Sequence, residues 1–186
     1  MYLHGFISSP QSRKATVMGD YVRNYGEGLG YRVPELHHRP SRALEQVLGV
    51  CAGIAREDLT LVGSSLGGFY ATVAAERLGC RAALLNPAVH PHAHFERYLG
   101  PQKNLYTGEE FVLTPGHVEE LRAMDLPSIT RPERYWLFVE TGDEVLDYRE
   151  AVAFYAGALH EVVRGGDHSL TTFPERLPEI ADWARS

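Results

Sequence analysis

The chain has 186 residues, 44% of them hydrophobic and 23% charged, which suits a single globular domain over residues 1–186. The formal net charge of −6 argues against nucleic acid and anionic membranes as partners, and no apolar run approaches the ~20 residues of a membrane-spanning helix. The two cysteines, Cys51 and Cys80, do not form a disulfide-like framework, so we expect reduced thiols and a cytoplasmic protein.

Strand-like and helix-like segments alternate along the chain, which is typical of an α/β fold with a mainly parallel sheet. Near the N-terminus, Ser9 followed by Pro10 predicts the N-cap and the first position of a helix. In chain order, the sequence predicts a strand at residues 1–4, a helix from 10 to about 25, a strand at 31–36, a helix from about 41, a strand at 59–62, a helix from 68, strands at 81–85, 135–139 and 159–163, and a closing helix around 177–184.

The segment Gly63-Ser64-Ser65-Leu66-Gly67 lies between a predicted strand and a predicted helix. A G-x-S-x-G sequence in that context indicates a nucleophile elbow, a sharp turn that holds the central serine at the carboxyl edge of a sheet. Gly63 and Gly67 are expected to leave room for the turn and for contact between helix and sheet. Ser65 is therefore the candidate nucleophile, and Ser64 is expected to support the turn.

Residues 88–132 interrupt the alternation, because they are too many for a simple connection between two strands. Long connections in a compact domain are usually functional. Thr114-Pro115 predicts the start of a helix inside this insertion. We expect the insertion to be a short lid over the site.

A serine hydroxyl needs a base to accept its proton, and the elbow predicts the chain order Ser, then Asp or Glu, then His. Only His160 and His168 follow the strand at 135–139. His160 lies inside a predicted strand, whereas His168 lies in a glycine-rich loop just after it. The loop position favours His168 as the general base.

The acid is expected in the loop after the strand at 135–139, which offers Glu140, Asp143, Glu144 and Asp147. Asp147 matches a capping box with Glu150, so it has a structural explanation. Asp143 follows a glycine at a tight turn, where a short carboxylate can orient an imidazole. Asp143 is favoured as the acid, and Asp147 stays open as the alternative.

An oxyanion hole requires N–H donors near the nucleophile. The N–H of Leu66, which follows the nucleophile, is one candidate, and the N–H of Phe6 after the first strand is the other. Gly5 permits the chain to bend there. His4 precedes the nucleophile, against the expected order, so we expect it to hold this loop rather than act as a base.

Several motifs together resemble the YqiA-like esterases, a family of small bacterial α/β-hydrolases. The resemblance implies a cytoplasmic ester or thioester hydrolase without a metal, with a triad of Ser65, Asp143 and His168 carried over by motif. It also implies a three-layer αβα fold whose six-stranded sheet has the order 2-1-3-4-5-6. The matching motifs, from Met1 to the C-terminal helix, are Leu3-His4-Gly5-Phe6, Ser8-Ser9-Pro10, residues 63–68, Asn86-Pro87-Ala88-Val89, Tyr98-Leu99-Gly100, Tyr106-Thr107-Gly108-Glu109 and Gly165-Gly166-Asp167-His168.

The leading hypothesis is therefore acyl transfer to water through an acyl-enzyme, without cofactor or metal. A small serine peptidase or amidase of the same fold, or a binding protein that keeps the fold without turnover, are the alternatives. The alternating histidines of residues 90–94 lack the cluster of other ligands that a metal site requires. We expect a small ester or acyl-thioester substrate and a monomer or weak homodimer. Acyl chain length and leaving group are not fixed by the sequence.

Overall fold

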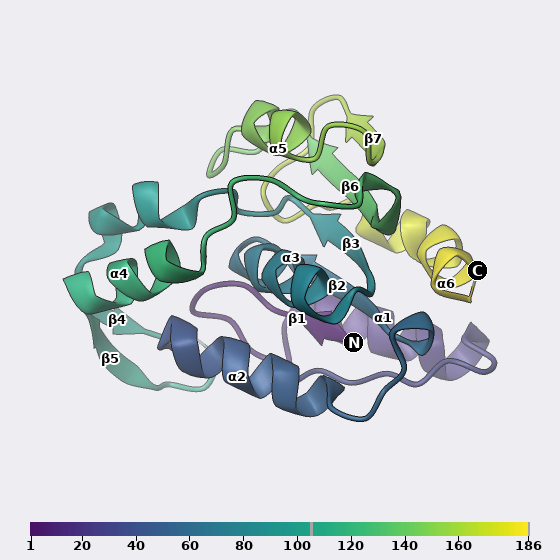
Figure 1. Cartoon of the computed structure of the whole chain (residues 1–186), viewed down its shortest axis with the longest axis horizontal. Coiled ribbons are helices and arrows are strands. Elements are labelled where there is room, and N and C mark those ends of the chain that lie inside the picture. The colour runs from purple at the N-terminus through teal and green to yellow at the C-terminus, as the bar shows by residue number, and fades with distance from the viewer. Residues whose placement is uncertain (105, 186) are drawn as a thin grey trace.

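Five strands form a parallel sheet in the computed structural model, which describes residues 1–104 and 106–185 (Figure 1). The sheet order is β1-β2-β3-β6-β7, and each neighbouring pair is parallel, with Val62 beside Tyr2 on one side and Ala83 on the other. All strands therefore end at the same edge of the sheet. The strands are β1 (Tyr2–Leu3), β2 (Thr60–Ser64), β3 (Arg81–Leu85), β6 (Tyr135–Glu140) and β7 (Leu159–Val163).

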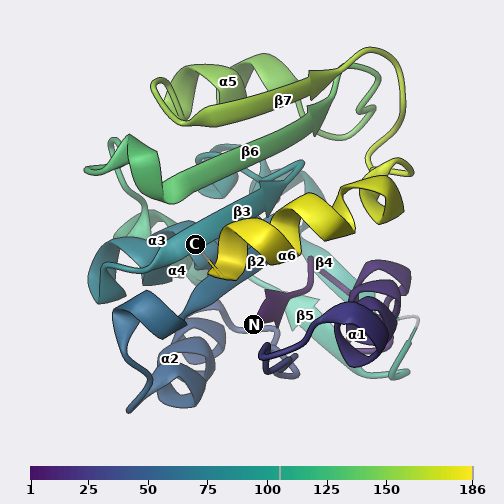
Figure 2. The ribbon, with the colours of Figure 1, turned by 90° about the vertical axis from the view of Figure 1, so that its right-hand side faces the viewer.

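Helices cover both faces of the sheet, which gives three layers (Figure 2). Successive strand residues point to opposite faces, so Leu61 and Leu84 belong to one hydrophobic cluster while Val62 and Ala83 belong to the other. This confirms the predicted αβα arrangement. The first cluster includes residues of α2 (Pro40–Cys51), α3 (Leu66–Leu78) and α5 (Tyr148–Phe154), and the second includes residues of α1 (Arg13–Tyr25) and α6 (Leu177–Arg185).

The predicted strand at residues 31–36 is wrong, so the described sheet has five strands rather than six. The segment does run beside β1, since the Tyr2 N–H donates to Arg32 O at 2.8 Å. A regular ladder does not follow, because Pro34 has no N–H and the Leu36 N–H donates to the His4 side chain instead, at 3.1 Å.

The first helix begins at Arg13, three residues later than predicted. Ser9 does cap a turn, but the turn is a separate one: its Oγ accepts from Gln11 N at 3.0 Å, and its carbonyl accepts from Ser12 N at 3.0 Å. Ser12, not Ser9, is therefore the N-cap of α1.

The insertion at residues 88–132 contains a hairpin and a helix. Strand β4 (Gly100–Lys103) pairs antiparallel with β5 (Glu110–Leu113). Helix α4 (Pro115–Met124) starts where predicted, at a Thr114 capping box, and Glu120 joins it to α2 by accepting from Ser41 N at 3.0 Å. Short 3-10 helices lie between these elements, at Arg56–Asp58, Pro91–Ala93, Phe95–Tyr98, Pro132–Arg134 and Phe173–Arg176.

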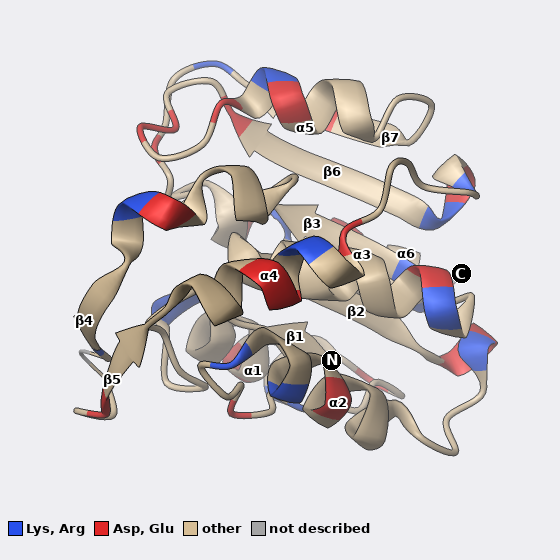
Figure 3. Ribbon diagram, turned by 60° about the vertical axis from the view of Figure 1, so that its left-hand side comes forward, with Lys and Arg blue, Asp and Glu red and all other residues tan. Residues whose placement is uncertain are grey.

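The surface carries both signs of charge, and acidic and basic residues are interspersed along the helices (Figure 3). Within the described residues, the helices lack the combination of length and apolar character needed to cross a membrane. Cys51 and Cys80 are buried and free.

Candidate active site

The turn between β2 and α3 forms as predicted for a nucleophile elbow. Ser65 has φ 55° and ψ −123°, a conformation that costs a non-glycine residue about 1–3 kcal/mol and persists only when its surroundings hold it. Here the Ser65 N–H donates to Leu85 O at 3.1 Å, and Ser65 O accepts from Gly68 N at 2.9 Å and Ala88 N at 3.0 Å. These contacts fix the serine at the carboxyl edge of the sheet.

Glycines around Ser65 allow three segments to approach one another. A Cβ at Gly63 would overlap Gly67 O, and a Cβ at Gly67 would overlap Leu3 O. A Cβ at Gly5 would lie 3.3 Å from the Ser65 Cβ. The glycines therefore let α3 pack on the sheet and bring the loop after β1 against the serine.

Ser65, His168 and Asp143 come together in one chain of contacts. His168 Nε2 lies 3.1 Å from Ser65 Oγ, and His168 Nδ1 lies 2.8 Å from Asp143 Oδ2. The three residues follow β2, β7 and β6, so they share an edge because parallel strands end there together. The Asp143 side chain is 2% exposed and that of His168 22% exposed, so solvent reaches the imidazole but hardly the carboxylate.

Asp143 is held as a carboxylate. Its Oδ1 accepts from the N–H groups of Val145 at 2.8 Å and Leu146 at 2.9 Å. Burial by itself raises the pKa of Asp143, but the hydrogen bonds from His168, Leu146 and Val145 outweigh it and the net pKa is lowered. An ionised Asp143 can only accept from Nδ1, which leaves Nε2 of a neutral His168 free to accept from the Ser65 hydroxyl.

Asp147 has a different environment. Its carboxylate accepts from Arg149 N at 3.0 Å as the N-cap of α5, and it forms an ion pair with the Arg149 guanidinium at 2.8 Å. The predicted N-cap is confirmed, but the capping box is not: Arg149 supplies the contact, and the Glu150 carboxylate lies 3.5 Å from His94. Glu144, another of the four candidate acids, accepts through its carboxylate from His168 N at 3.0 Å.

Glu140 and Asn86 hold the His168 loop, a role that was not predicted from the sequence, where Glu140 was only a candidate acid and Asn86 only part of a motif. Glu140 is fully buried, and its carboxylate accepts from Asp167 N and Thr172 Oγ1, each at 2.7 Å. Asn86 accepts from Glu140 N at 3.0 Å and donates through Nδ2 to Asp167 O at 3.0 Å and to His168 O at 3.3 Å. Their places in the sequence were the available signal: Asn86 directly follows β3 and Glu140 is the last residue of β6, so both lie at the carboxyl edge of the sheet.

Glu140→Gln is expected to destabilise the protein by about 1–3 kcal/mol. Glutamine has the same shape as glutamate but only one side-chain oxygen. Either the Asp167 N–H or the Thr172 hydroxyl therefore loses its buried acceptor. Urea unfolding measures the difference. Glu133→Gln is the matched control, because the Glu133 side chain is 64% exposed, and it should leave the unfolding midpoint unchanged. Equal midpoints for the two variants would contradict the role given to Glu140.

Two residues beside Ser65 have backbone N–H groups that could serve as oxyanion donors. Leu66 and Phe6 both line the pocket that contains Ser65 and His168. Within residues 1–104 and 106–185, neither backbone N–H has a hydrogen-bond acceptor. Both are therefore available to a group bound at Ser65, and their part in an oxyanion hole stays a prediction.

His4 lies beneath the loop that carries Phe6. It is 3% exposed, its Nδ1 contacts Gly5 O at 3.0 Å, and its Nε2 accepts from Leu36 N at 3.1 Å. Burial lowers the pKa of His4, against smaller raising effects of the Gly5 hydrogen bond and of Glu35. A neutral ring is what these contacts need, because Nδ1–H must donate while Nε2 accepts. The geometry agrees with the expected loop-holding role.

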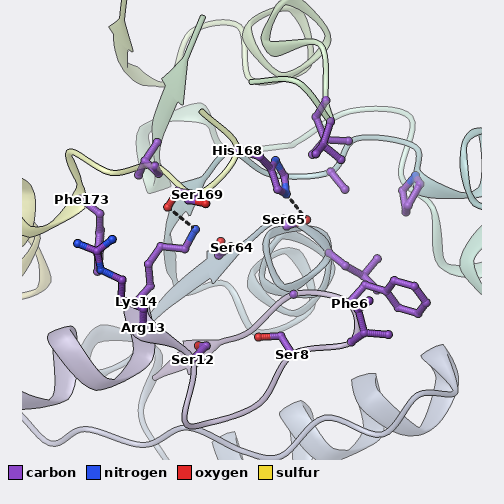
Figure 4. A pocket seen from close by; sticks show the side chains of 18 of the residues that line it. Phe6, Ser8, Ser12, Arg13, Lys14, Ser64, Ser65, His168, Ser169 and Phe173 are labelled. Atoms are coloured by element: carbon purple, nitrogen blue, oxygen red, sulfur yellow. Dashed lines mark hydrogen bonds between the residues drawn. The ribbon is translucent and has the colours of Figure 1, made fainter. Parts of the chain in front are cut away.

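A pocket of about 600 Å³ opens at Ser65 (Figure 4). On one side lie the packed aromatic rings of Phe6, Phe95 and Tyr98. The insertion supplies much of this wall, so it does adjoin the site, and its action as a lid stays a prediction. On the other side of Ser65 are Ser12, Arg13 and Lys14 from the start of α1.

The alternating histidines of the insertion contact carboxylates. His90 Nδ1 lies 2.7 Å and His92 Nδ1 3.6 Å from Asp125 Oδ2, while His94 Nε2 lies 3.5 Å from Glu150 Oε2. Among the residues that the structure describes, no group of three or more His, Cys, Asp or Glu is placed to hold a metal ion.

Comparison with known proteins places these features in context. The model of the uncharacterised protein family UPF0227 matches residues 1–185. Solved structures that are similar include a protein of Agrobacterium vitis S4 described as a hydrolase (21% identity, 100% of this chain and 87% of that one, TM-score 0.80) and mouse alpha/beta hydrolase domain-containing protein 10 (15%, 98% and 87%, 0.75). The esterase domain of a Rhodothermus marinus protein is also similar (18%, 99% and 85%, 0.67). These likenesses confirm the predicted α/β-hydrolase fold.

Proposed function

The chain belongs to the uncharacterised protein family UPF0227, the YqiA family, and from the contacts of Ser65 we propose that it is a serine hydrolase of carboxylic esters or acyl thioesters. The observation that carries the proposal is the unbroken chain Ser65 Oγ to His168 Nε2 at 3.1 Å and His168 Nδ1 to Asp143 at 2.8 Å. A buried carboxylate, an imidazole in the required tautomer and a serine on a strained turn form the arrangement that acyl transfer needs.

The proposed reaction has two halves. Ser65 Oγ attacks the carbonyl carbon while His168 Nε2 takes the hydroxyl proton, and the tetrahedral oxyanion is held by the N–H groups of Phe6 and Leu66. His168 returns the proton to the departing alcohol or thiol, which leaves an acyl-Ser65 ester. Water then attacks that ester with His168 as base, and the carboxylic acid and free Ser65 are released. Throughout, Asp143 orients the ring and stabilises the imidazolium without taking a proton.

Two further features favour a small acyl substrate. The pocket is about 600 Å³, within the range of small-molecule sites, and aromatic side chains form one wall. The esterase domain from Rhodothermus marinus has the same fold. We propose that Ser65, Asp143 and His168 are the catalytic residues and that His4, Gly5, Gly63 and Gly67 support them.

A fluorophosphonate probe tests the proposal directly, because it phosphonylates only an activated serine. The wild-type protein is expected to form one adduct, located on Ser65 by peptide mass spectrometry, whereas Ser65→Ala should form none. Ser64→Ala is the matched control and should label normally. Absence of labelling in the wild type would rule out a serine hydrolase, while a panel of esters and thioesters of graded chain length would define the substrate of a protein that labels.

A further inference from the structure

The start of α1 has an unusual charge pattern. Its first two residues are Arg13 and Lys14, and its first turn has no acidic residue. The positive end of the helix dipole favours anionic groups there and disfavours basic ones. Within the described residues, neither Arg13 nor Lys14 forms an ion pair with a carboxylate. Positive charge is thus concentrated here without a protein counter-ion in contact.

Ser12, the N-cap of α1, has an unused hydroxyl. The residue is 8% exposed, it makes no side-chain capping bond, and its buried Oγ has no hydrogen-bond partner among the described residues. A buried hydroxyl without a partner is costly. Since Ser12 also lines the pocket at Ser65, a bound group could supply the missing contact.

Lys14 reaches further into the same pocket. Its Nζ donates to Ser169 O at 2.9 Å, next to His168 in the chain, and Figure 4 draws the amine near Ser64. An ammonium group has three donors, so this contact leaves others for a ligand. Burial lowers the pKa of Lys14 to about 8, although Asp167, Asp143 and Glu140 act in the opposite direction. An anion bound beside the amine would favour its charged form.

We propose that Ser12, Arg13 and Lys14 form an anion subsite that binds a carboxylate or phosphate group of the substrate. The inference rests on the proposed function, whose substrate class it specifies: an ester or thioester with an anionic group on one side of the reacting carbonyl and an apolar group on the other. Ser65 lies between the two halves of the pocket, so the carbonyl reaches the nucleophile when both ends are seated (Figure 4).

The subsite must act locally. The protein has a net charge of −6, and its surface charges are interspersed (Figure 3), so the molecule as a whole does not attract anions. Selectivity for an anionic ester therefore has to come from these few groups. Hydrogen bonds to charged partners are about twice as strong as neutral ones, which makes the α1 terminus the strongest feature of the pocket for discrimination between substrates.

Two esters that differ by one charge test the subsite. Mono(4-nitrophenyl) adipate carries a free carboxylate, and its methyl ester does not. We expect the wild type to prefer the anionic ester in kcat/KM by about 10- to 100-fold, as a charge-assisted contact allows. Lys14→Met should lower this ratio at least tenfold, whatever the lost contact with Ser169 does to the hydrolysis of both esters. Lys103→Met is the matched control, because Lys103 is the other lysine of the chain, is exposed and pairs with Glu110 at 2.8 Å.

A wild-type ratio near one would overturn the subsite and leave the proposed function intact. So would a Lys14→Met variant that loses both activities equally, since Lys14 would then only hold the His168 loop. Arg97 also lines the pocket, where its guanidinium lies over the Tyr98 ring at 4.9 Å. A selectivity lost in Arg97→Met instead would place the anion at that wall. Calorimetry on Ser65→Ala is independent of turnover: adipate or inorganic phosphate should bind, and Lys14→Met should abolish that binding. Whichever of the two ligands binds more tightly shows whether the subsite prefers a carboxylate or a phosphate. If neither ligand binds, the subsite is contradicted.

Discussion

Ser65→Ala is expected to lower kcat for activated short-chain esters by about 10⁴- to 10⁶-fold, because it removes the proposed nucleophile, and the residues of such a triad act as a unit. The fold should persist. The Ser65 hydroxyl contacts His168 Nε2 at 3.1 Å, whereas the bonds that hold the turn are made by backbone atoms that alanine retains. Alanine also bears the same φ of 55° at no greater steric cost than serine.

The measurement is steady-state hydrolysis of 4-nitrophenyl butyrate, with urea unfolding as the check on folding. Ser64→Ala is the matched control, because Ser64 is the adjacent residue and the substitution removes the same hydroxyl group. It is expected to keep kcat within a few-fold of wild type. If Ser64→Ala were the inactive variant, or if Ser65→Ala kept substantial activity while folded, the assignment of the nucleophile would be wrong.

Asp143→Asn is expected to lower kcat by about 10³- to 10⁴-fold. The asparagine side chain fits the same space, but it can present an NH₂ group toward His168 Nδ1. Nδ1 would then accept, and the ring proton would move to Nε2, where it blocks proton transfer from Ser65. The variant protein should therefore bind substrate but fail to activate the serine, so kcat falls far more than KM changes.

Asp147→Asn is the comparison that decides between the two carboxylates. Asparagine is as good an N-cap as aspartate, and the Asp147 carboxylate is joined to Arg149 rather than to His168. We expect Asp147→Asn to keep kcat within a few-fold of wild type. An Asp147→Asn variant that loses far more activity than Asp143→Asn would show that the acid has been assigned to the wrong residue.

Patterns that are local in the chain gave accurate predictions. The strands at Arg81–Leu85 and Leu159–Val163 have the predicted bounds, because each is a short segment of strand-forming residues that ends at turn-forming ones. The elbow at Ser65 was equally recognisable, since its G-x-S-x-G pattern and the strand and helix beside it are consecutive in the chain. Chain order then placed the candidate serine, acid and histidine at the ends of strands that share one edge.

Where a neighbour elsewhere in the fold decides the outcome, local patterns failed. Residues 31–36 look like a strand, yet the Leu36 N–H bonds to the His4 side chain rather than to a neighbouring strand. Ser9-Pro10 looks like a helix start, but a separate turn forms there and α1 begins at Arg13. Propensity describes what a segment can do, and the surrounding structure selects among the options.

The sequence by itself determined the α/β architecture, the elbow and a short set of candidate partners for Ser65, because periodicity and turn signals depend on residues that are close together in the chain. Only the tertiary structure decided which carboxylate meets His168, that Glu140 holds the histidine loop, and that Ser12, Arg13 and Lys14 line the same pocket as Ser65. Ser65 and His168 are 103 positions apart, and Glu140 and Asp167 are 27 apart. Contacts over such separations depend on how the layers pack, a property that no local segment contains.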